Sequence, residues 1–229
     1  MKIGLLICDQ VKEKYRSEFG DYPEMFTALF PDYTFVNYRV YLGEFPERVE
    51  DCSAYMATGA THSAYDDLEW ITKTKSFIRA IYKANSYFIG FCFGHQLMAE
   101  ALGGKVEKAT VGWCVGVHRF KVFQQRDWMK PALDAVNFLM MCQDQVVKLP
   151  AQGHSVAGNQ DCPNAIMQIG DRMISVQGHP EFVKAYNEKL MRDRIKRIGE
   201  DKVTRGIASL EMEVDVPAFQ NWVHEFLSS

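Results

Sequence analysis

The sequence predicts a single α/β domain over residues 1–229, with a mostly parallel central sheet and helices on both faces. Three observations support this fold class. Short apolar runs alternate with amphipathic helical stretches. No repeat, low-complexity segment or Pro/Ser-rich linker divides the chain. A chain of 229 residues is also long enough to bury one large core without a disulfide or a metal.

The first half of the chain supplies most of the parallel strands in this prediction. Residues 34–41 alternate and are rich in aromatic and β-branched side chains, which favours a strand. Asp66 and Asp67 are acidic residues placed where they favour the positive end of a helix. The predicted strands here are residues 3–8, 34–41, 54–58 and 87–91. The predicted helices are one that ends over residues 23–30, and those at residues 66–83 and 94–102.

The second half is richer in strands. Gly170-Asp171-Arg172 separates two apolar runs and therefore predicts a hairpin. The predicted strands of this half are residues 117–123, 136–141, 165–169 and 173–176. Two helices, residues 182–198 and 217–227, are predicted to close the domain.

Composition and charge exclude several functional classes. The formal net charge of -3 argues against broad electrostatic binding to nucleic acid or to an anionic membrane. The six cysteines are scattered without a CxxC pair, so we expect free thiols rather than a structural zinc site. The first apolar run is too short for a signal peptide, and no run is long enough to span a bilayer. These features predict a reduced, cytoplasmic setting.

The segment Gly90-Phe91-Cys92-Phe93-Gly94 contains most of the functional information. A predicted strand runs into Gly-x-Cys-x-Gly, and a predicted helix follows at once. This is the pattern of a nucleophile elbow, in which flanking glycines make room for a sharp, strained turn. The thiol would project above the carboxyl edge of the sheet, at a helix N-terminus that favours the thiolate. Taken alone, the same residues also fit a buried structural cysteine.

Gly178-His179-Pro180-Glu181 supplies the base that a thiolate nucleophile needs. A carboxylate two residues beyond His179 is able to fold back onto one imidazole nitrogen and leave the other facing Cys92. Taken alone, this segment is equally a turn with an acidic residue at the start of a helix. Together with the cysteine elbow, it predicts a Cys92, His179 and Glu181 triad.

The remaining histidines have no neighbouring carboxylate arranged like Glu181. His95 follows the elbow and is expected to line the pocket. His154 lies in a polar segment that is expected to be a loop bordering the site.

Two motifs together resemble those of a known family: Gly90-x-Cys92-x-Gly94-x-Gln96 and, 87 residues after the cysteine, Gly178-His179-Pro180-Glu181. Their order and spacing resemble the class I, or triad, glutamine amidotransferases, which have a flavodoxin-like α/β fold. The resemblance extends from the first predicted strand to about Phe182. It is closest to a stand-alone branch that includes GMP-synthase-like amidotransferases and plant γ-glutamyl peptidases. The further segments that resemble this branch are Thr58-Gly59-Ala60-x-x-Ser63-Ala64-Tyr65-Asp66-Asp67, Gly103-Gly104-Lys105-Val106 and Gly112-Trp113.

The resemblance implies a role for several further residues. Backbone N–H groups of Gly59, Ala60 and Phe93 would form the oxyanion hole, which stabilises the charge that develops on a tetrahedral oxygen. Substrate-binding residues implied in the same way are Gln96, Tyr65 and Asp144. Neither a metal nor an organic cofactor is implied.

The segment before Asp144 departs from the family pattern. Met141-Cys142-Gln143 replaces a Ser-His or similar pair, which leaves open whether the substrate is free glutamine. Ala60 also stands where serine or glycine is common, although a backbone donor survives that change.

Three functions follow from the resemblance. The first is hydrolysis of glutamine to glutamate and ammonia through a γ-glutamyl thioester, with a synthase partner subunit as one destination for the ammonia. The second is γ-glutamyl peptidase activity on small peptides. The third is a catalytically silent regulatory subunit, against which the intact Cys92, His179 and Glu181 argue.

Overall fold

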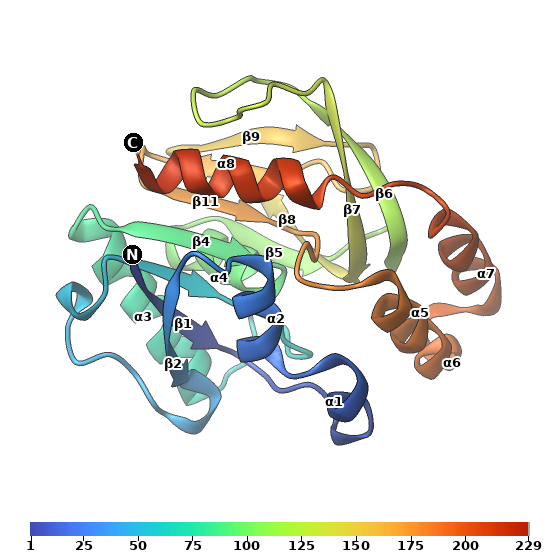
Figure 1. Cartoon of the computed structure of the whole chain (residues 1–229), viewed down its shortest axis with the longest axis horizontal. Coiled ribbons are helices and arrows are strands. Elements are labelled where there is room, and N and C mark those ends of the chain that lie inside the picture. The colour runs from blue at the N-terminus through green and yellow to red at the C-terminus, as the bar shows by residue number, and fades with distance from the viewer. Residues whose placement is uncertain (229) are drawn as a thin grey trace.

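The computed structural model describes residues 1–228 and contains a large twisted sheet with helices packed against it (Figure 1). Its strands are β1 (Lys2–Ile7), β2 (Thr34–Arg39), β3 (Ala54–Ala57), β4 (Tyr87–Phe91), β5 (Lys105–Lys108), β6 (Cys114–Val122), β7 (Ala135–Cys142), β8 (Asp144–Lys148), β9 (Gly153–Gly158), β10 (Ile166–Ile169) and β11 (Met173–Val176). Its α-helices are α1 (Glu13–Phe19), α2 (Tyr22–Leu29), α3 (Glu69–Lys83), α4 (Phe93–Ala101), α5 (Lys184–Asp193), α6 (Ile195–Ile198), α7 (Glu200–Ser209) and α8 (Val216–Ser228), and short 3-10 helices cover Val40–Leu42 and Val49–Asp51.

Within residues 1–228, nine strands form one sheet in the order β2-β1-β3-β4-β11-β10-β9-β6-β7. The first five strands in this order run parallel to one another. The remaining four pair antiparallel and extend the sheet at one end. The antiparallel pair β10 and β11 confirms the hairpin predicted around Gly170. Strands β5 and β8 form a separate two-stranded ribbon.

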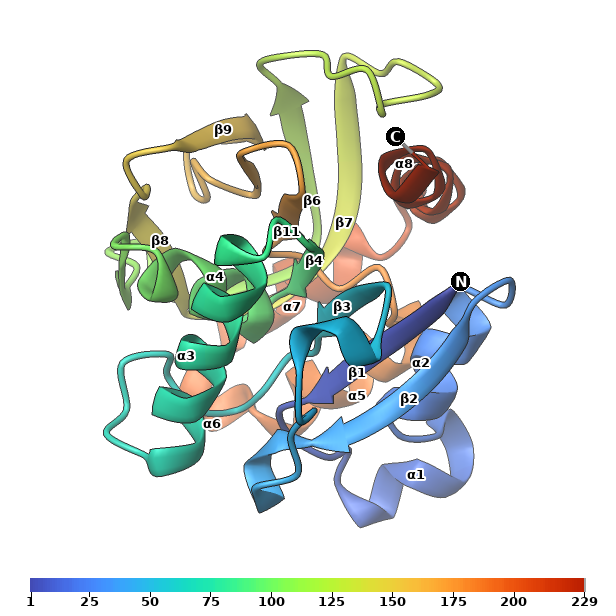
Figure 2. The same ribbon diagram turned by 90° about the vertical axis from the view of Figure 1, so that its left-hand side faces the viewer.

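Helices cover both faces of the sheet, as predicted (Figure 2). Successive strand residues point to opposite faces because the side-chain period of a strand is two. Leu5 of β1 therefore packs into the core beneath α2 and α8, together with Phe26 and Trp222. Leu6, its neighbour, packs into the core beneath α3 and α4, together with Ile78. These two buried cores fix the parallel strands between them.

Two predicted helices begin or end differently in the structure. The helix expected from residue 66 begins at Glu69, because Asp66 closes a turn instead and accepts the backbone N–H of Ser63 at 3.0 Å. The helix expected over residues 182–198 is interrupted at Arg194, which separates α5 from α6. The residues before α5 stay outside it, since Phe182 packs on His179.

Strands β5, β8 and β9, helix α7 and the two 3-10 helices were not predicted, and α1 is separate from α2, the helix predicted to end over residues 23–30. The three strands are short and mostly polar, so their hydrophobic alternation is weak. His154 consequently lies in β9, paired with Gln168 of β10, rather than in a loop. None of the helices in residues 1–228 combines the length and apolarity needed to cross a bilayer.

Candidate active site

Cys92 occupies a strained turn between β4 and α4. Its φ of 48° and ψ of -99° lie where side chains other than glycine are rarely found. The flanking glycines explain how the turn fits. A Cβ on Gly90 would lie 2.6 Å from the backbone of Gly94, and a Cβ on Gly94 would lie 2.4 Å from the carbonyl oxygen of Ala57. Any larger residue at either position would therefore push the strand, turn and helix apart.

The backbone of Cys92 is anchored to the neighbouring parallel strand. Its N–H donates to the carbonyl oxygen of Val176, the last residue of β11, at 2.8 Å. The residue is 5% exposed and lines two small cavities, of about 150 Å³ and about 50 Å³. It also precedes the first turn of α4, where the unpaired N–H groups of a helix favour a negative charge.

His179 follows β11 and is held in a single orientation. Its backbone N–H donates to the carbonyl oxygen of Leu139 at 2.8 Å. Its Nδ1 lies 2.7 Å from Oε1 of Glu181, and both side chains are buried. The ring of Phe182 stacks on the imidazole with 4.0 Å between centroids and an interplanar angle of 6°. The hydrogen bond fixes the tautomer, and the stacked ring fixes the imidazole plane.

Charges around the imidazole determine its protonation. Burial lowers the pKa of His179, but the negative charges of Cys92 and Glu181, and hydrogen bonds to both, outweigh it and raise the pKa to about 10. His179 is therefore an imidazolium at neutral pH when Cys92 is a thiolate. A thiolate beside an imidazolium is the arrangement that attack by sulfur and proton transfer from nitrogen require.

This charge coupling makes a pH prediction. We expect His179 to keep its proton through neutral pH and to lose it only as the pH rises through about 10. Cys92→Ala removes the charge and the hydrogen bond through which Cys92 raises the pKa of His179, so this pKa should fall. Nitrogen-15 NMR of the labelled imidazole in both proteins measures the two midpoints. Identical midpoints would mean that Cys92 and His179 do not form an ion pair.

The predicted oxyanion loop lies directly beside these two side chains. A Cβ on Gly59 would lie 3.0 Å from Cε1 of His179 and 3.7 Å from Cβ of Cys92. Asp9 fixes the loop, because its carboxylate accepts the backbone N–H and the hydroxyl of Thr61 at 2.8 Å and 2.7 Å. Among residues 1–228, no acceptor pairs with the backbone N–H groups of Gly59, Ala60 and Phe93. Of these three residues, Ala60 lines both cavities beside Cys92.

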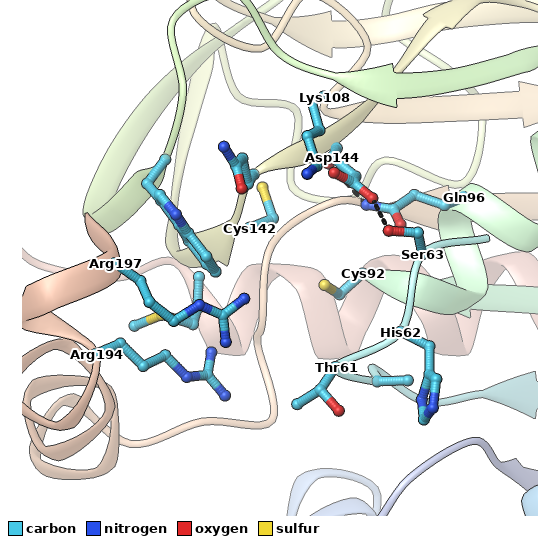
Figure 3. A pocket seen from close by; sticks show the side chains of 14 residues that line it. Thr61, His62, Ser63, Cys92, Gln96, Lys108, Cys142, Asp144, Arg194 and Arg197 are labelled. Atoms are coloured by element: carbon cyan, nitrogen blue, oxygen red, sulfur yellow. Dashed lines mark hydrogen bonds between the residues drawn. The ribbon is translucent and has the colours of Figure 1, made fainter. Parts of the chain in front are cut away.

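The residues predicted to bind substrate lie on one side of Cys92, and Figure 3 shows Asp144, Gln96 and Ser63 grouped there. Ser63 donates its hydroxyl to Oδ2 of Asp144 at 2.5 Å. The side-chain amide of Gln96 donates to the carbonyl oxygen of Asp144 at 2.8 Å and to Oε1 of Gln177 at 3.1 Å. Asp144 and Gln96 both line the larger cavity. Tyr65 is 43% exposed, and its phenol interacts with Ser63 and Asp144 at the edge of this group.

His95 does not line the pocket, contrary to the expectation from sequence. Its side chain is fully buried, and its Nδ1 lies 2.8 Å from the hydroxyl of Ser175 in β11. Burial lowers the pKa of His95 to about 3, so the ring is neutral. The helical period explains the error, because His95 is on the α4 face that packs against the sheet.

Three cationic residues of the larger cavity were missed: Lys108, Arg194 and Arg197. Cys142 belongs to the segment before Asp144 that departs from the family pattern, and it lines the same cavity. Lys108 could be found only through strand pairing, because it lies opposite Asp144 in the β5–β8 ribbon. Arg194 lies between α5 and α6 and Arg197 lies in α6, and no sequence motif marks them.

Comparisons with known proteins agree with this architecture. A family model described as glutamine amidotransferase class-I matches residues 56–197. Gamma-glutamyl peptidase 4 of Arabidopsis thaliana is 30% identical over 206 residues, which cover 86% of this chain and 80% of the relative. The glutamine-hydrolyzing GMP synthase of an Azoarcus strain is 30% identical over 142 residues, covering 58% of this chain but 26% of that protein.

Solved structures show the same fold. The crystal structure of a glutamine amidotransferase from Thermotoga maritima has a TM-score of 0.75 and 18% identity, with 99% of both chains covered. The glutaminase domain of Trypanosoma brucei CTPS has a TM-score of 0.59 and 12% identity, covering 80% of this chain and 87% of that one. The family match over more than half of the chain, together with the 30% identical relative, establishes that this protein belongs to the class I glutamine amidotransferases.

Proposed function

We propose that the protein hydrolyses γ-glutamyl amide bonds, with Cys92 as nucleophile, His179 as general acid and base, and Glu181 as the residue that orients His179. The observation that carries this proposal is the 2.7 Å hydrogen bond between His179 and Glu181 beside the strained Cys92 turn. A thiolate, a positioned imidazole and a fixed carboxylate are the groups that acyl transfer through a thioester requires.

The reaction proceeds in two stages. The Cys92 thiolate attacks the γ-carbonyl carbon, and N–H groups of Gly59, Ala60 and Phe93 stabilise the resulting oxyanion. The imidazolium of His179 gives its proton to the leaving nitrogen, so the C–N bond breaks and a γ-glutamyl thioester remains. Neutral His179 then takes a proton from water, whose oxygen attacks the thioester. Glutamate leaves, and the thiolate and imidazolium are restored.

The glutamyl part of the substrate is assigned to the polar group beside the elbow. Asp144 carries the negative charge that suits an α-ammonium group, and Ser63 holds that carboxylate in place. Gln96 and Tyr65 complete this end of the site in our proposal.

The leaving group defines two candidate activities. Glutamine would release ammonia, which a synthase partner subunit would consume, as the similarity to GMP synthase suggests. A γ-glutamyl peptide would release an amino acid or peptide. The second candidate is favoured by the four Arabidopsis gamma-glutamyl peptidases among the relatives, which match over 80% of this chain or more.

The first experiment measures glutamate release by the purified protein from glutamine and, separately, from γ-glutamylglycine. We expect turnover of at least one substrate, and its loss in Cys92→Ala. Inactivation of the wild-type protein by a glutamine-analogue alkylator, with the label on Cys92, is the second expected result. No turnover together with no labelling would refute the proposed function and would favour a silent subunit.

A further inference from the structure

The larger cavity carries more positive charge than free glutamine requires. Lys108, Arg194 and Arg197 line it, whereas Asp144 is its single carboxylate among residues 1–228. In this described part of the chain, none of the three cations forms an ion pair with a protein carboxylate. Glutamine bears one ammonium and one carboxylate, so Asp144 and one cation would satisfy it. Two cations then remain without a carboxylate partner.

The cations lie at two separate ends of the cavity. Lys108 lies opposite Asp144 in the β5–β8 ribbon, and both are drawn on the same side of Cys92 (Figure 3). Arg194 and Arg197 come from the α5–α6 region and extend toward Cys92 from the other side. The neighbouring positions of Lys108 and Asp144 suit the α-carboxylate and α-ammonium of a glutamyl group, which are bonded to one carbon.

The position of His179 identifies the other end of the cavity. The smaller cavity is lined by His179, Cys92 and Arg194, but by neither Asp144 nor Lys108. Because His179 protonates the leaving nitrogen in the proposed mechanism, the leaving group must lie on this side of Cys92. Arg194 lines both cavities and is therefore adjacent to the place where the leaving group sits.

We propose that Arg194 and Arg197 form a subsite for a carboxylate on the leaving group, so that the preferred substrates are γ-glutamyl amino acids or peptides with a free C-terminus. This proposal rests on the proposed function. A guanidinium binds a carboxylate through two parallel hydrogen bonds, which suits recognition of a chain end. The Arg197 guanidinium lies over the ring of Trp113, with Cζ 5.5 Å from its centroid, which orients it at the cavity wall.

The test compares three substrates with the same glutamyl group: γ-glutamylglycine, γ-glutamylglycinamide and glutamine. We expect the Arg194→Gln/Arg197→Gln variant to lose about 10- to 100-fold in kcat/KM on γ-glutamylglycine, mostly through KM. On the amide and on glutamine, which lack the second carboxylate, the loss should stay below about 3-fold. Arg192→Gln is the matched control, because this exposed α5 arginine pairs with Glu188 and does not line the cavity.

The outcomes distinguish failure of the carboxylate subsite from failure of the proposed function. Equal losses on all three substrates would overturn the subsite, because the arginines would then bind the shared glutamyl group. No loss on γ-glutamylglycine would overturn it as well. In both cases Cys92-dependent turnover by the wild-type protein would leave the proposed function standing. Absence of wild-type turnover on all three substrates would overturn the subsite, and together with no labelling of Cys92 it would refute the proposed function as well.

Discussion

Cys92→Ala is expected to lower the rate of glutamate release by at least ~10⁴-fold, because no other group at the elbow forms the thioester. Its stability should remain close to that of the wild type, since the alanine keeps the same strained backbone. The measurement is the single-turnover rate with the better substrate, combined with urea unfolding. Cys52→Ala is the control for loss of a buried thiol. Cys52 precedes the amino end of β3, whereas Cys92 follows the carboxyl end of β4.

Cys92→Gly tests whether the backbone at residue 92 is strained, independently of catalysis. Glycine adopts positive φ without a steric cost, whereas other residues in such regions cost about 1–3 kcal/mol. Glycine also loses more chain entropy on folding and lacks the alanine methyl group. We therefore expect Cys92→Gly to be about 1 kcal/mol more stable than Cys92→Ala and equally inactive. If glycine were the less stable of the two, the turn would not store strain.

Glu181→Gln is expected to lower kcat by about 10²- to 10⁴-fold while the fold is retained. Glu181 accepts the Nδ1 proton of His179, so Nε2 remains directed at Cys92. A glutamine is able to donate its NH₂ to Nδ1 instead, which would stabilise the wrong tautomer. Loss of the carboxylate charge should also lower the pKa of His179, because that charge raises it.

The two effects of Glu181→Gln are measured together in a pH profile of kcat. We expect a lower plateau and an alkaline limb that moves to lower pH. Glu188→Gln is the control, since Glu188 is an α5 carboxylate that pairs with Arg192 and lines neither cavity beside Cys92. A lower plateau without any movement of the alkaline limb would contradict the electrostatic part of this role.

The parts of the site that sequence predicts well are those encoded by local steric rules. A strand, a Gly-x-Cys-x-Gly turn and a helix specify where Cys92 projects, because only glycine fits at residues 90 and 94. The two-residue spacing of His179 and Glu181 likewise specifies a contact, since proline between them limits the backbone. Neither inference required knowledge of distant segments.

The three cations of the larger cavity, Lys108, Arg194 and Arg197, were not predicted because their positions depend on long-range packing. Arg194 lines the cavity from the point where α5 ends and α6 begins, a break that no sequence pattern marks. Lys108 reaches Asp144 through an antiparallel ribbon whose strands lack a clear hydrophobic alternation. The expectation that His95 lines the pocket was wrong for a related reason. Its proximity to the elbow in sequence does not specify which face of α4 it occupies.

The hydrogen bond between the N–H of Cys92 and the carbonyl of Val176 has a consequence for how this chain can change in length. The segment from α4 through β10 connects β4 to β11, and these two strands are direct neighbours in the sheet. The length of that segment therefore does not determine the distance between the sulfur of Cys92 and the imidazole of His179. Insertions in surface connections, such as the one between β6 and β7, would therefore leave the reacting atoms in register. Doubling a flexible loop costs only about 0.6 kcal/mol in closure entropy. The domain can thus acquire new surfaces without moving its chemistry.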